Sequence, residues 1–413
     1  MNELSQLPKN WKWVKLGEVC KLKNGFAFKS TEYINEGIPV IRISDIKSGS
    51  VKPDKSVRVV SKKDYEEYVV LENEILVAMS GATTGKFGIY KSKDKAYQNQ
   101  RVGKFQILHK DNLDNDFLLY QLHALKRQIE KDAYGGAQPN ISSGKIEAME
   151  ILLPPKPIQQ AIVSKIEELF SELDKGIENL RTAQQQLKTY RQAVLKWAFE
   201  GKLTNEHVID SELPKGWKSI VLGDVCKNVE YGSATKSKEQ GKVPVLRMGN
   251  IQNGKFDWDD LVYTDSDDEI KKYLLKKDDV LFNRTNSAEW VGKTAIYRGE
   301  RPAIFAGYLI RINRIENLLD ANFITYYLNS LEAKKFGNSV RSFGVNQSNI
   351  NGTKLKTYPI SLPPLIEQEK IVQEIESRLS VADKMEESIT QSLQQAEALR
   401  QSILKKAFEG KLI

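Results

Sequence analysis

The chain has 413 residues, which is too long for one ordinary core and predicts two to four structural units. Its composition, 40% hydrophobic and 28% charged, excludes a wholly disordered or collagen-like chain, and no apolar run is long enough to cross a bilayer. The first residues lack the pattern of a secretory signal, so we expect a cytoplasmic protein with no membrane association. With 62 basic and 54 acidic residues, the net charge of +8 favours a polyanionic partner.

The first segment, residues 1–153, is predicted to form a mixed α/β domain. Short β-rich runs at 38–41, 74–77 and 87–90 are separated by clusters of Gly, Asn and Ser, a pattern typical of strands and loops. One helical pattern stands out between them and the end of the segment, around Asp116 to Lys131.

The second segment, residues 154–203, is predicted to be one long helix. After Pro154-Pro155, apolar residues recur at steps of mostly three and four. They are Ile162, Ile166, Leu169, Leu173, Ile177, Leu180, Leu187 and Val194. The pattern predicts a helix of about 44 residues, or roughly 65 Å at 1.5 Å per residue. A helix that carries a single apolar stripe over this length must bury the stripe against another helix.

The rest of the chain repeats the first half in the same order. Residues 204–362 are therefore predicted to form a second mixed domain, with a helix around Asn322 to Lys335, and residues 363–413 a second long helix. The matching segments are Leu7–Trp11 with Leu213–Trp217, Leu16–Cys20 with Leu222–Cys226, Ile38–Ile43 with Val243–Met248, Gly85–Lys86 with Gly292–Lys293, and Ala198–Leu203 with Ala407–Leu412. This period is too long for a solenoid, so the chain is interpreted as a duplicated two-part module.

These segments together predict an α+β fold in which two mixed α/β domains are separated by two long helices. The obvious partner of each helix is the other one, which gives an intramolecular coiled coil. We expect antiparallel pairing and a pseudo-two-fold relation between the halves, because duplicated modules tend to be related like the subunits of an isologous dimer. Ile166 should then lie nearer Ile403 than Ile375. The alternative is a coil shared with a different subunit.

Motifs for catalysis or cofactor binding are weak or missing. Ser287–Thr294 is one residue short of a phosphate-binding loop, and the matching Gly81–Phe87 has the wrong spacing. We interpret both as Gly-Lys turns between strands. The chain contains no methyltransferase tetrapeptide, serine elbow or cysteine–histidine pair, so we predict no catalytic residue, no metal ligand and no cofactor on this chain. Cys20 and Cys226 are expected to be small buried core residues.

Polar loops in both domains carry the residue types that contact DNA. Asn, Gln and Arg make bidentate contacts to adenine and guanine, and they collect in loops that differ between the two copies. Base contacts are predicted for Arg101, Gln138, Asn140, Arg284, Asn286, Arg341, Asn346 and Gln347, and phosphate contacts for Lys86 and Lys293. Arg42 and Arg247 occupy matching places after a strand, where a shared phosphate contact or a structural role is expected. The alternative for each loop is a polar surface without a binding role.

In these features the whole chain resembles the specificity (S, or HsdS) subunit of type I restriction-modification systems. The most specific motifs are the Leu-Pro-x-x-Trp opening and the Leu-Gly-(Glu/Asp)-Val of each module, together with the Phe-Glu-Gly-Lys-Leu ends. An Ile-x-Leu-Pro-Pro motif precedes each long helix, at Ile151–Pro155 and Ile360–Pro364. Glu367-Gln368 follows the second motif as the family pattern has it, whereas the first copy departs with Ile158-Gln159.

The resemblance implies a non-catalytic, sequence-specific DNA-binding subunit. Target recognition domains at 1–153 and 204–362 would each read one half of a bipartite, asymmetric site in double-stranded DNA, and the helices would set the unread spacer. Adenine-N6 methylation would belong to two modification (methyltransferase) subunits that use S-adenosylmethionine. Cleavage would belong to restriction/translocase subunits that use ATP and Mg²⁺.

Two alternatives come from other classes of protein. A DNA methyltransferase or nuclease with fused recognition domains would need the catalytic residues that the sequence lacks. A structural coiled-coil scaffold would not need two large, loop-rich domains that differ from each other.

Overall fold

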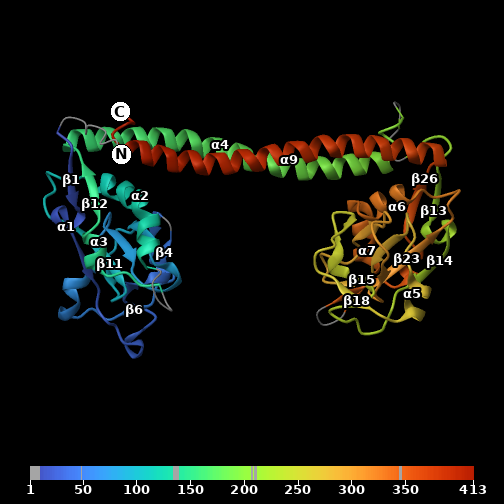
Figure 1. The fold of residues 1–413 in the computed structure, drawn as a ribbon, viewed down its shortest axis with the longest axis horizontal. Coiled ribbons are helices and arrows are strands. Elements are labelled where there is room, and N and C mark those ends of the chain that lie inside the picture. Colours follow the sequence, from blue (N-terminus) through green and yellow to red (C-terminus); the bar gives the residue numbers. More distant parts are fainter. Residues whose placement is uncertain (1–9, 48, 134–138, 206–207, 209–211, 344–346) are drawn as a thin grey trace. The chain divides into compact units, whose positions relative to one another are not determined.

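The computed structural model describes residues 10–47, 49–133, 139–205, 208, 212–343 and 347–413. Contacts divide the chain into two units, one formed by Met1–Leu180 with Gln391–Ile413 and the other by Arg181–Thr390. Each of the two long helices contributes one part to each unit (Figure 1). In the described part of the chain, no helix is long and apolar enough to span a membrane.

The globular part of the first unit mixes short strands with a few helices (Figure 1). Its strands are β1 (Lys12–Lys15), β2 (Cys20–Asn24), β3 (Ile38–Ile41), β4 (Ile46–Lys47), β5 (Gly49–Val51), β6 (Arg58–Val59), β7 (Val69–Val70), β8 (Ile75–Ala78), β9 (Phe87–Tyr90), β10 (Ala96–Gln98), β11 (Val102–Ile107) and β12 (Glu150–Leu153). They form sheets of order β2-β11-β8-β9-β5-β4 and β6-β3-β10-β7 and the pair β1-β12. The helices are α1 (Leu16–Val19), α2 (Asn115–Ala133) and α3 (Ser143–Glu147). The three strands predicted in this segment are confirmed as β3, β8 and β9.

The globular part of the second unit repeats this mixture. Its strands are β13 (Lys218–Val221), β14 (Cys226–Tyr231), β15 (Val243–Leu246), β16 (Ile251–Gln252), β17 (Lys255–Phe256), β18 (Val262–Thr264), β19 (Val280–Asn283), β20 (Thr285–Asn286), β21 (Thr294–Ile296), β22 (Ile304–Phe305), β23 (Leu309–Arg314), β24 (Ser342–Phe343), β25 (Ser348–Asn349) and β26 (Pro359–Leu362). The sheets have the orders β14-β23-β19-β21, β18-β15-β22 and β20-β25-β24, beside the pairs β13-β26 and β16-β17. The helices are α5 (Asp267–Tyr273), α6 (Ala321–Leu328), α7 (Leu331–Val340) and α8 (Gly352–Lys356).

The prediction of one helix around Asn322 to Lys335 is wrong in its continuity, because two helices occupy this region. The side chain of Ser330 accepts a hydrogen bond from the backbone N–H of Ala333, so Ser330 caps the start of α7. The side chain of Asn329 contacts the neighbouring strand β21, where it donates a hydrogen bond to the carbonyl oxygen of Thr294 at 2.8 Å. In the first copy the corresponding helix, α2, is continuous over 19 residues.

Both long helices, α4 (Lys156–Phe199) and α9 (Leu365–Phe408), have the predicted 44 residues. Their shared Phe-Glu-Gly-Lys-Leu ends explain where they stop. Gly201 and Gly410 have positive φ angles of 78° and 68°, which is the left-handed conformation that ends a helix and that glycine adopts without strain. The next residue, Lys202 or Lys411, donates its N–H back to the carbonyl oxygen of Trp197 or Lys406 at 2.8 Å.

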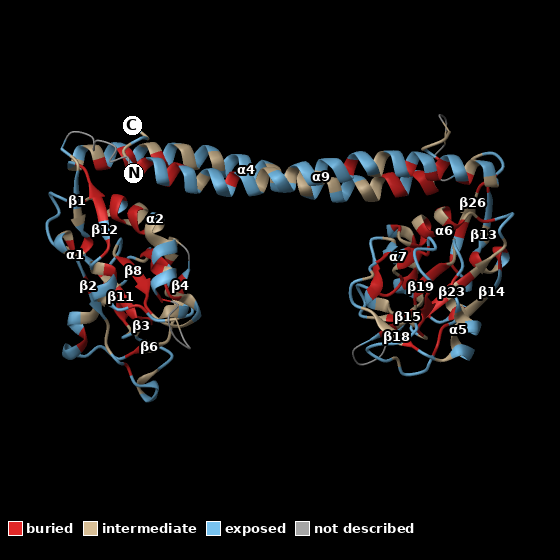
Figure 2. Cartoon of the chain, in the orientation of Figure 1, coloured by how far each residue is buried: buried red, intermediate tan, exposed pale blue. Residues whose placement is uncertain are grey.

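In each unit, the start of one long helix packs with the end of the other. Ile162 and Ile166 of α4 share a hydrophobic cluster with Ile403 of α9 in the first unit. In the second unit, Val194 of α4 shares a cluster with Ile375 of α9. Within the first unit, Ile166 therefore shares a cluster with Ile403. Figure 2 shows that burial in both helices concentrates toward their ends.

Ion pairs join the two helices in both units. Arg400 of α9 pairs with Asp174 of α4, and its guanidinium lies 4.4 Å from the centre of the Phe170 ring. In the second unit, Arg191 of α4 contacts two carboxylates of α9, those of Asp383 at 2.6 Å and Glu386 at 2.9 Å. These half-exposed pairs contribute little stability each, and their geometry serves mainly to fix the register.

A fully buried glutamine fastens the start of each long helix to its globular domain. The Oε1 atom of Gln159 accepts a hydrogen bond from the N–H of Asp114 at 2.8 Å, and its Nε2 donates to the carbonyl oxygens of Asn112 and Pro154 at the same distance. Asp114 in turn caps α2 by accepting the N–H of Phe117.

The second copy reproduces this clamp. Gln368 accepts from the N–H of Asp320 at 2.8 Å and donates to the carbonyl oxygens of Leu318 and Pro363 at 2.8 and 2.9 Å. Asp320 caps α6 through the N–H of Phe323. The glutamine of the motif thus joins helix to domain in both halves.

Candidate nucleic-acid interface

The two domains share one backbone framework around their polar loops. In the first, the N–H of Met79 donates to the carbonyl oxygen of Arg101 at 3.0 Å, and the N–H of Ile141 donates to the carbonyl oxygen of Met79 at 3.0 Å. Ser80 then forms an antiparallel bridge with Asn140. The loops that carry Arg101 and Asn140 therefore meet at the end of β8.

The second domain repeats these hydrogen bonds with different side chains. The N–H of Arg284 donates to the carbonyl oxygen of Tyr308 at 3.0 Å, and the N–H of Ile350 donates to the carbonyl oxygen of Arg284 at 2.9 Å. Thr285 pairs with Asn349, as Ser80 pairs with Asn140 in the first domain.

The Gly-Lys turns also match, as the sequence predicted. Gly85 and Gly292 have positive φ angles of 81° and 90°, which glycine adopts without strain. The carbonyl oxygen of the following lysine, Lys86 or Lys293, accepts a strand hydrogen bond at 2.8 Å from Ala78 or Asn283. Both lysines therefore occupy the same place beside the framework.

The surroundings of the two lysines differ. The side chain of Lys86 is exposed. That of Lys293 is half-buried, with its Nζ 3.6 Å from the centre of the Trp290 ring and 3.2 Å from Oε1 of Gln252. Burial and the neighbouring charge of Lys334 lower the pKa of Lys293.

Among the candidates of the first domain, Arg101 and Asn140 are exposed on the shared framework, and Gln138 lies outside the described residues. Their neighbour Gln98 does not lie in the polar loop that carries Arg101. It ends β10 and is almost fully buried, where its Nε2 donates to the carbonyl oxygens of Lys23 and Val102 at 2.7 and 2.6 Å. Its role is structural.

In the second domain, Arg284 and Asn286 lie half-buried on the framework. The guanidinium of Arg284 is 4.9 Å from the centre of the Tyr231 ring, a cation–π contact. Its Nε is buried without a hydrogen-bond partner among the described residues, as are Oδ1 of Asn283 and, in the first domain, Oγ of Ser80.

Two further candidates border the same small sheet. Arg341 precedes β24 and donates from Nη1 to the carbonyl oxygen of Ala288 at 3.2 Å and to Oδ1 of Asn338 at 2.8 Å. Gln347 is exposed just before β25. Asn346 lies outside the described residues.

Arg42 and Arg247 stand at matching places, each before a 3₁₀ turn, η2 (Ile43–Asp45) or η6 (Met248–Asn250). The side chain of Arg247 donates from Nη2 to the carboxylate of Asp260 at 3.0 Å. Nε of Arg42 lies 3.7 Å from Oδ2 of Asp45, which also accepts the N–H of Arg42. The sequence left open a shared phosphate contact or a structural role for these two arginines, and these contacts favour the structural role.

Sequence reasoning missed three aromatic residues of the second domain. Tyr231, Trp290 and Tyr308 are 40%, 43% and 51% exposed, and each lies beside a candidate cation or on the framework itself. Exposed aromatic rings can stack on bases or hold a cation in place. Aligning the two copies at Arg101 would have revealed Tyr308.

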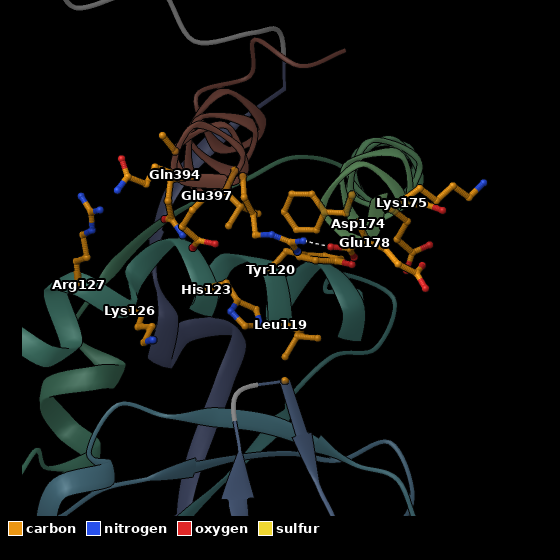
Figure 3. A pocket seen from close by; sticks show the side chains of 18 of the residues that line it. Leu119, Tyr120, His123, Lys126, Arg127, Asp174, Lys175, Glu178, Gln394 and Glu397 are labelled. Atoms are coloured by element: carbon orange, nitrogen blue, oxygen red, sulfur yellow. Dashed lines mark hydrogen bonds and ion pairs between the residues drawn. The ribbon is translucent and has the colours of Figure 1, made fainter. Parts of the chain in front are cut away.

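A cleft of about 1350 Å³ lies in the first unit among α2, α4 and α9 (Figure 3). It contains carboxylates and cations together, including the Asp174–Arg400 ion pair drawn dashed in Figure 3. His123 lines it and packs on Phe87, and burial lowers its pKa to about 4.

No group of metal-binding side chains occurs among the residues that the structure describes. Cys20 and Cys226 are buried and free, as predicted.

Comparison with known proteins identifies the family. The family model for the type I restriction modification DNA specificity domain matches residues 8–181 and 214–396. The chain is 26% identical to the type I restriction enzyme EcoBI specificity subunit of Escherichia coli, over 100% of this chain and 88% of that protein. It is 25% identical to the EcoKI specificity subunit of E. coli strain K12, over 98% of this chain and 90% of that protein.

Solved structures share the fold. A chain from a study of complex assembly and conformational transition in a type I restriction-modification system gives a TM-score of 0.77 at 20% identity, over 98% of this chain and 99% of the other. The HsdS subunit of Thermoanaerobacter tengcongensis gives 0.62 at 19% identity, over 99% of each chain. Since the two matches of the family model fall on the two copies of the repeat and cover most of the sequence, the chain belongs to the type I restriction-modification DNA specificity family.

Proposed function

We propose that this chain is the subunit that recognises DNA in a type I restriction-modification complex, with one half-site read by each globular domain. The recognition domains would be residues 1–153 and 204–362. The observation that carries the proposal is that polar residues which differ between the copies gather at one matching place on a shared backbone framework. One scaffold that presents two sets of side chains suits a site whose two halves differ in sequence.

The proposed contacts divide into two kinds. Lys86 and Lys293 would bind phosphates from the Gly-Lys turns, because an ammonium group at a loop tip is a point charge without base preference. Base contacts would come from the framework side chains. In the first domain these are Arg101 and Asn140, and in the second they are Arg284, Asn286, Arg341 and Gln347. Arg42 and Arg247 would hold the turns that follow β3 and β15.

The two long helices, residues 154–203 and 363–413, would form an antiparallel coiled coil that sets the gap between half-sites. The packing of Ile166 with Ile403 in one unit and Val194 with Ile375 in the other supports this arrangement. Antiparallel pairing of a duplicated module implies a pseudo-two-fold axis, so the two domains would approach opposite strands of the duplex in inverted orientation.

Chemistry would reside on partner chains. The chain is a specificity subunit and not an enzyme. Two modification subunits would supply methyl transfer from S-adenosylmethionine to the N6 atom of adenine, and restriction/translocase subunits would supply ATP-dependent cleavage. These partners are proposed because the relatives are named as subunits of type I restriction enzymes.

The proposal is tested by selecting binding sites from a random double-stranded DNA library with the full-length chain, co-expressed with its modification subunits. We expect a two-part consensus with a constant gap. One contiguous consensus, or no enrichment, would contradict the proposal. The purified chain alone, incubated with DNA and labelled S-adenosylmethionine or ATP, should show no turnover, and turnover would contradict its assignment as a specificity subunit.

A further inference from the structure

The two domains carry their main guanidinium group on different strands of the same framework. The first has Met79 at the end of β8 and Arg101 opposite it, and the second has Arg284 and Tyr308 at these two positions. The backbone hydrogen bonds that define the positions are 3.0 Å long in both domains. The arginine therefore occupies the accepting position of this hydrogen-bonded pair in the first domain and the donating position in the second.

Buried neighbours differ around the position that holds Met79 in one domain and Arg284 in the other. In the first domain, Gly103 leaves room for Met79, since a Cβ atom at Gly103 would lie only 2.8 Å from the Met79 sulfur. The corresponding residue of the second domain is Ile310, which is fully buried and pairs with Phe282 as Gly103 pairs with Val77. With this space filled, the side chain that replaces Met79 must lie elsewhere.

A fourth position completes the set. Gly103 pairs with Asn24 in the first domain, and Ile310 pairs with Tyr231 in the second. The ring of Tyr231 supports the guanidinium of Arg284 at 4.9 Å, a contact that the asparagine at the matching place could not provide. Four linked positions thus differ together, as Asn24, Met79, Arg101 and Gly103 in one domain and Tyr231, Arg284, Tyr308 and Ile310 in the other.

We infer that these four positions form a specificity module in which the position of the guanidinium selects the base pair at which each half-site requires guanine. The inference rests on the proposed function and deepens it. Arginine is the usual partner of the O6 and N7 atoms of guanine, and on the framework Arg101 is exposed and Arg284 is half-buried. Because the two guanidinium groups project from different strands, the guanines they read should lie at different distances from the spacer.

Single substitutions give the first test, again by selection from a random library with the full-length chain and its modification subunits. Arg101→Gln should relax one position of the first half-site by roughly 5- to 150-fold, and Arg284→Gln one position of the second half-site by a similar factor. The matched controls are Lys91→Gln and Arg298→Gln, at the opposite ends of the adjoining strands, which should leave both consensus halves unchanged.

The distance of each relaxed position from the spacer decides the inference. Unequal distances in the two halves support it, and equal distances would overturn it. A wild-type chain that selects no two-part consensus would instead overturn the proposed function.

The second test grafts the whole set into the first domain, as Asn24→Tyr, Met79→Arg, Arg101→Tyr and Gly103→Ile. We expect the guanine of the first half-site to move to the distance found in the second; an unmoved guanine in a graft that binds DNA would contradict the inference.

Discussion

Lys86 and Lys293 occupy one place on the framework but differ in how firmly they are held. Lys86 is exposed, whereas Lys293 lies over the Trp290 ring and is partly desolvated. A lysine that is already ordered loses less side-chain entropy when it binds a phosphate. We therefore expect Lys293 to contribute more to the affinity for DNA than Lys86.

Replacing either lysine should weaken DNA binding without changing sequence preference. We expect Lys293→Ala to weaken binding to all sequences and to lower the slope of log K against log salt by about one, because one fewer counterion is released. Titration of labelled DNA at several salt concentrations measures this slope, with Lys91→Ala as the control. A change in the selected consensus, with an unchanged slope, would show that Lys293 reads a base.

We expect His123 to make the stability of the first unit depend on pH. Burial, with the charges of Lys126 and Arg400, lowers its pKa from 6.5 to about 4, so below pH 6.5 the unfolded chain binds this proton more readily than the folded one. The free energy of unfolding is therefore highest above pH 6.5. It decreases as the pH falls toward 4, by about 3 kcal/mol in total. Urea unfolding between pH 7 and 4.5 should show this decrease, and His123→Leu should reduce it. An equally steep decrease in the variant would refute the assignment.

At the level of single residues, the sequence predicted where the polar loops lie better than which side chains are accessible. Gln98 belongs to a polar run but faces the core, because its amide satisfies two strand carbonyl oxygens. Tyr308 was overlooked because one aromatic residue in a loop has no pattern of its own. Its importance appears only when strand pairing places it at the position of Arg101.

At the level of secondary-structure elements, the glutamine after each Pro-Pro pair has the clearest role. The second copy has Glu367-Gln368 here, and the first copy has Ile158-Gln159. The glutamine of each pair makes the three clamp hydrogen bonds, whereas Glu367 accepts hydrogen bonds from the side chains of Thr204 and Asn205 beside it. Ile158 packs instead on the hydrophobic cluster of the first unit, so the departure leaves the clamp intact.

Removing the clamp should loosen a recognition domain on its helix. Gln159→Leu leaves a buried N–H and two carbonyl oxygens without partners, which should cost about 2–3 kcal/mol in the free energy of unfolding. The neighbouring Gln160 is exposed, so Gln160→Leu is a matched control. Urea unfolding of both variants measures the difference, and equal stabilities would show that the clamp does not stabilise the domain.

The helix pairing can be tested at its middle, where burial is incomplete. Leu180 and Leu393 are half-buried, so an aspartate there would place a carboxylate against the opposite helix. We expect Leu180→Asp or Leu393→Asp to destabilise the coil by about 2 kcal/mol or more, and the exposed Gln186→Asp to have little effect. Cysteine crosslinking of residue 166 to 403, in preference to 375, would independently support the antiparallel order. The opposite preference would contradict it.

The helices were the most predictable elements and the small sheets the least. A three-and-four stripe that continues from Ile162 to Val194 predicts one long helix, and both helices have the predicted length. The break between α6 and α7 was not predicted, because it depends on a side-chain contact between Asn329 and Thr294 that joins distant parts of the chain. Strands of two residues, such as β20, depend on similar long-range pairing.

For the whole molecule, duplication is the organising feature. It was visible in the sequence because the framework motifs recur in order, and the matching hydrogen bonds of the two domains confirm that the copies share local structure. The candidate interface could be predicted only as sets of loops. Strand pairing then brought Arg101 together with Asn140, and Asn286 with Ser348, from positions far apart in the chain.

The central claim, one half-site for each domain under a pseudo-two-fold axis, is tested most directly by domain exchange. Residues 204–362 are replaced by a second copy of residues 1–153, and the binding site is selected from random DNA with the modification subunits present. We predict that the first half-site appears twice as an inverted repeat with an unchanged gap. Retention of the original second half-site, or two copies in direct repeat, would contradict the account.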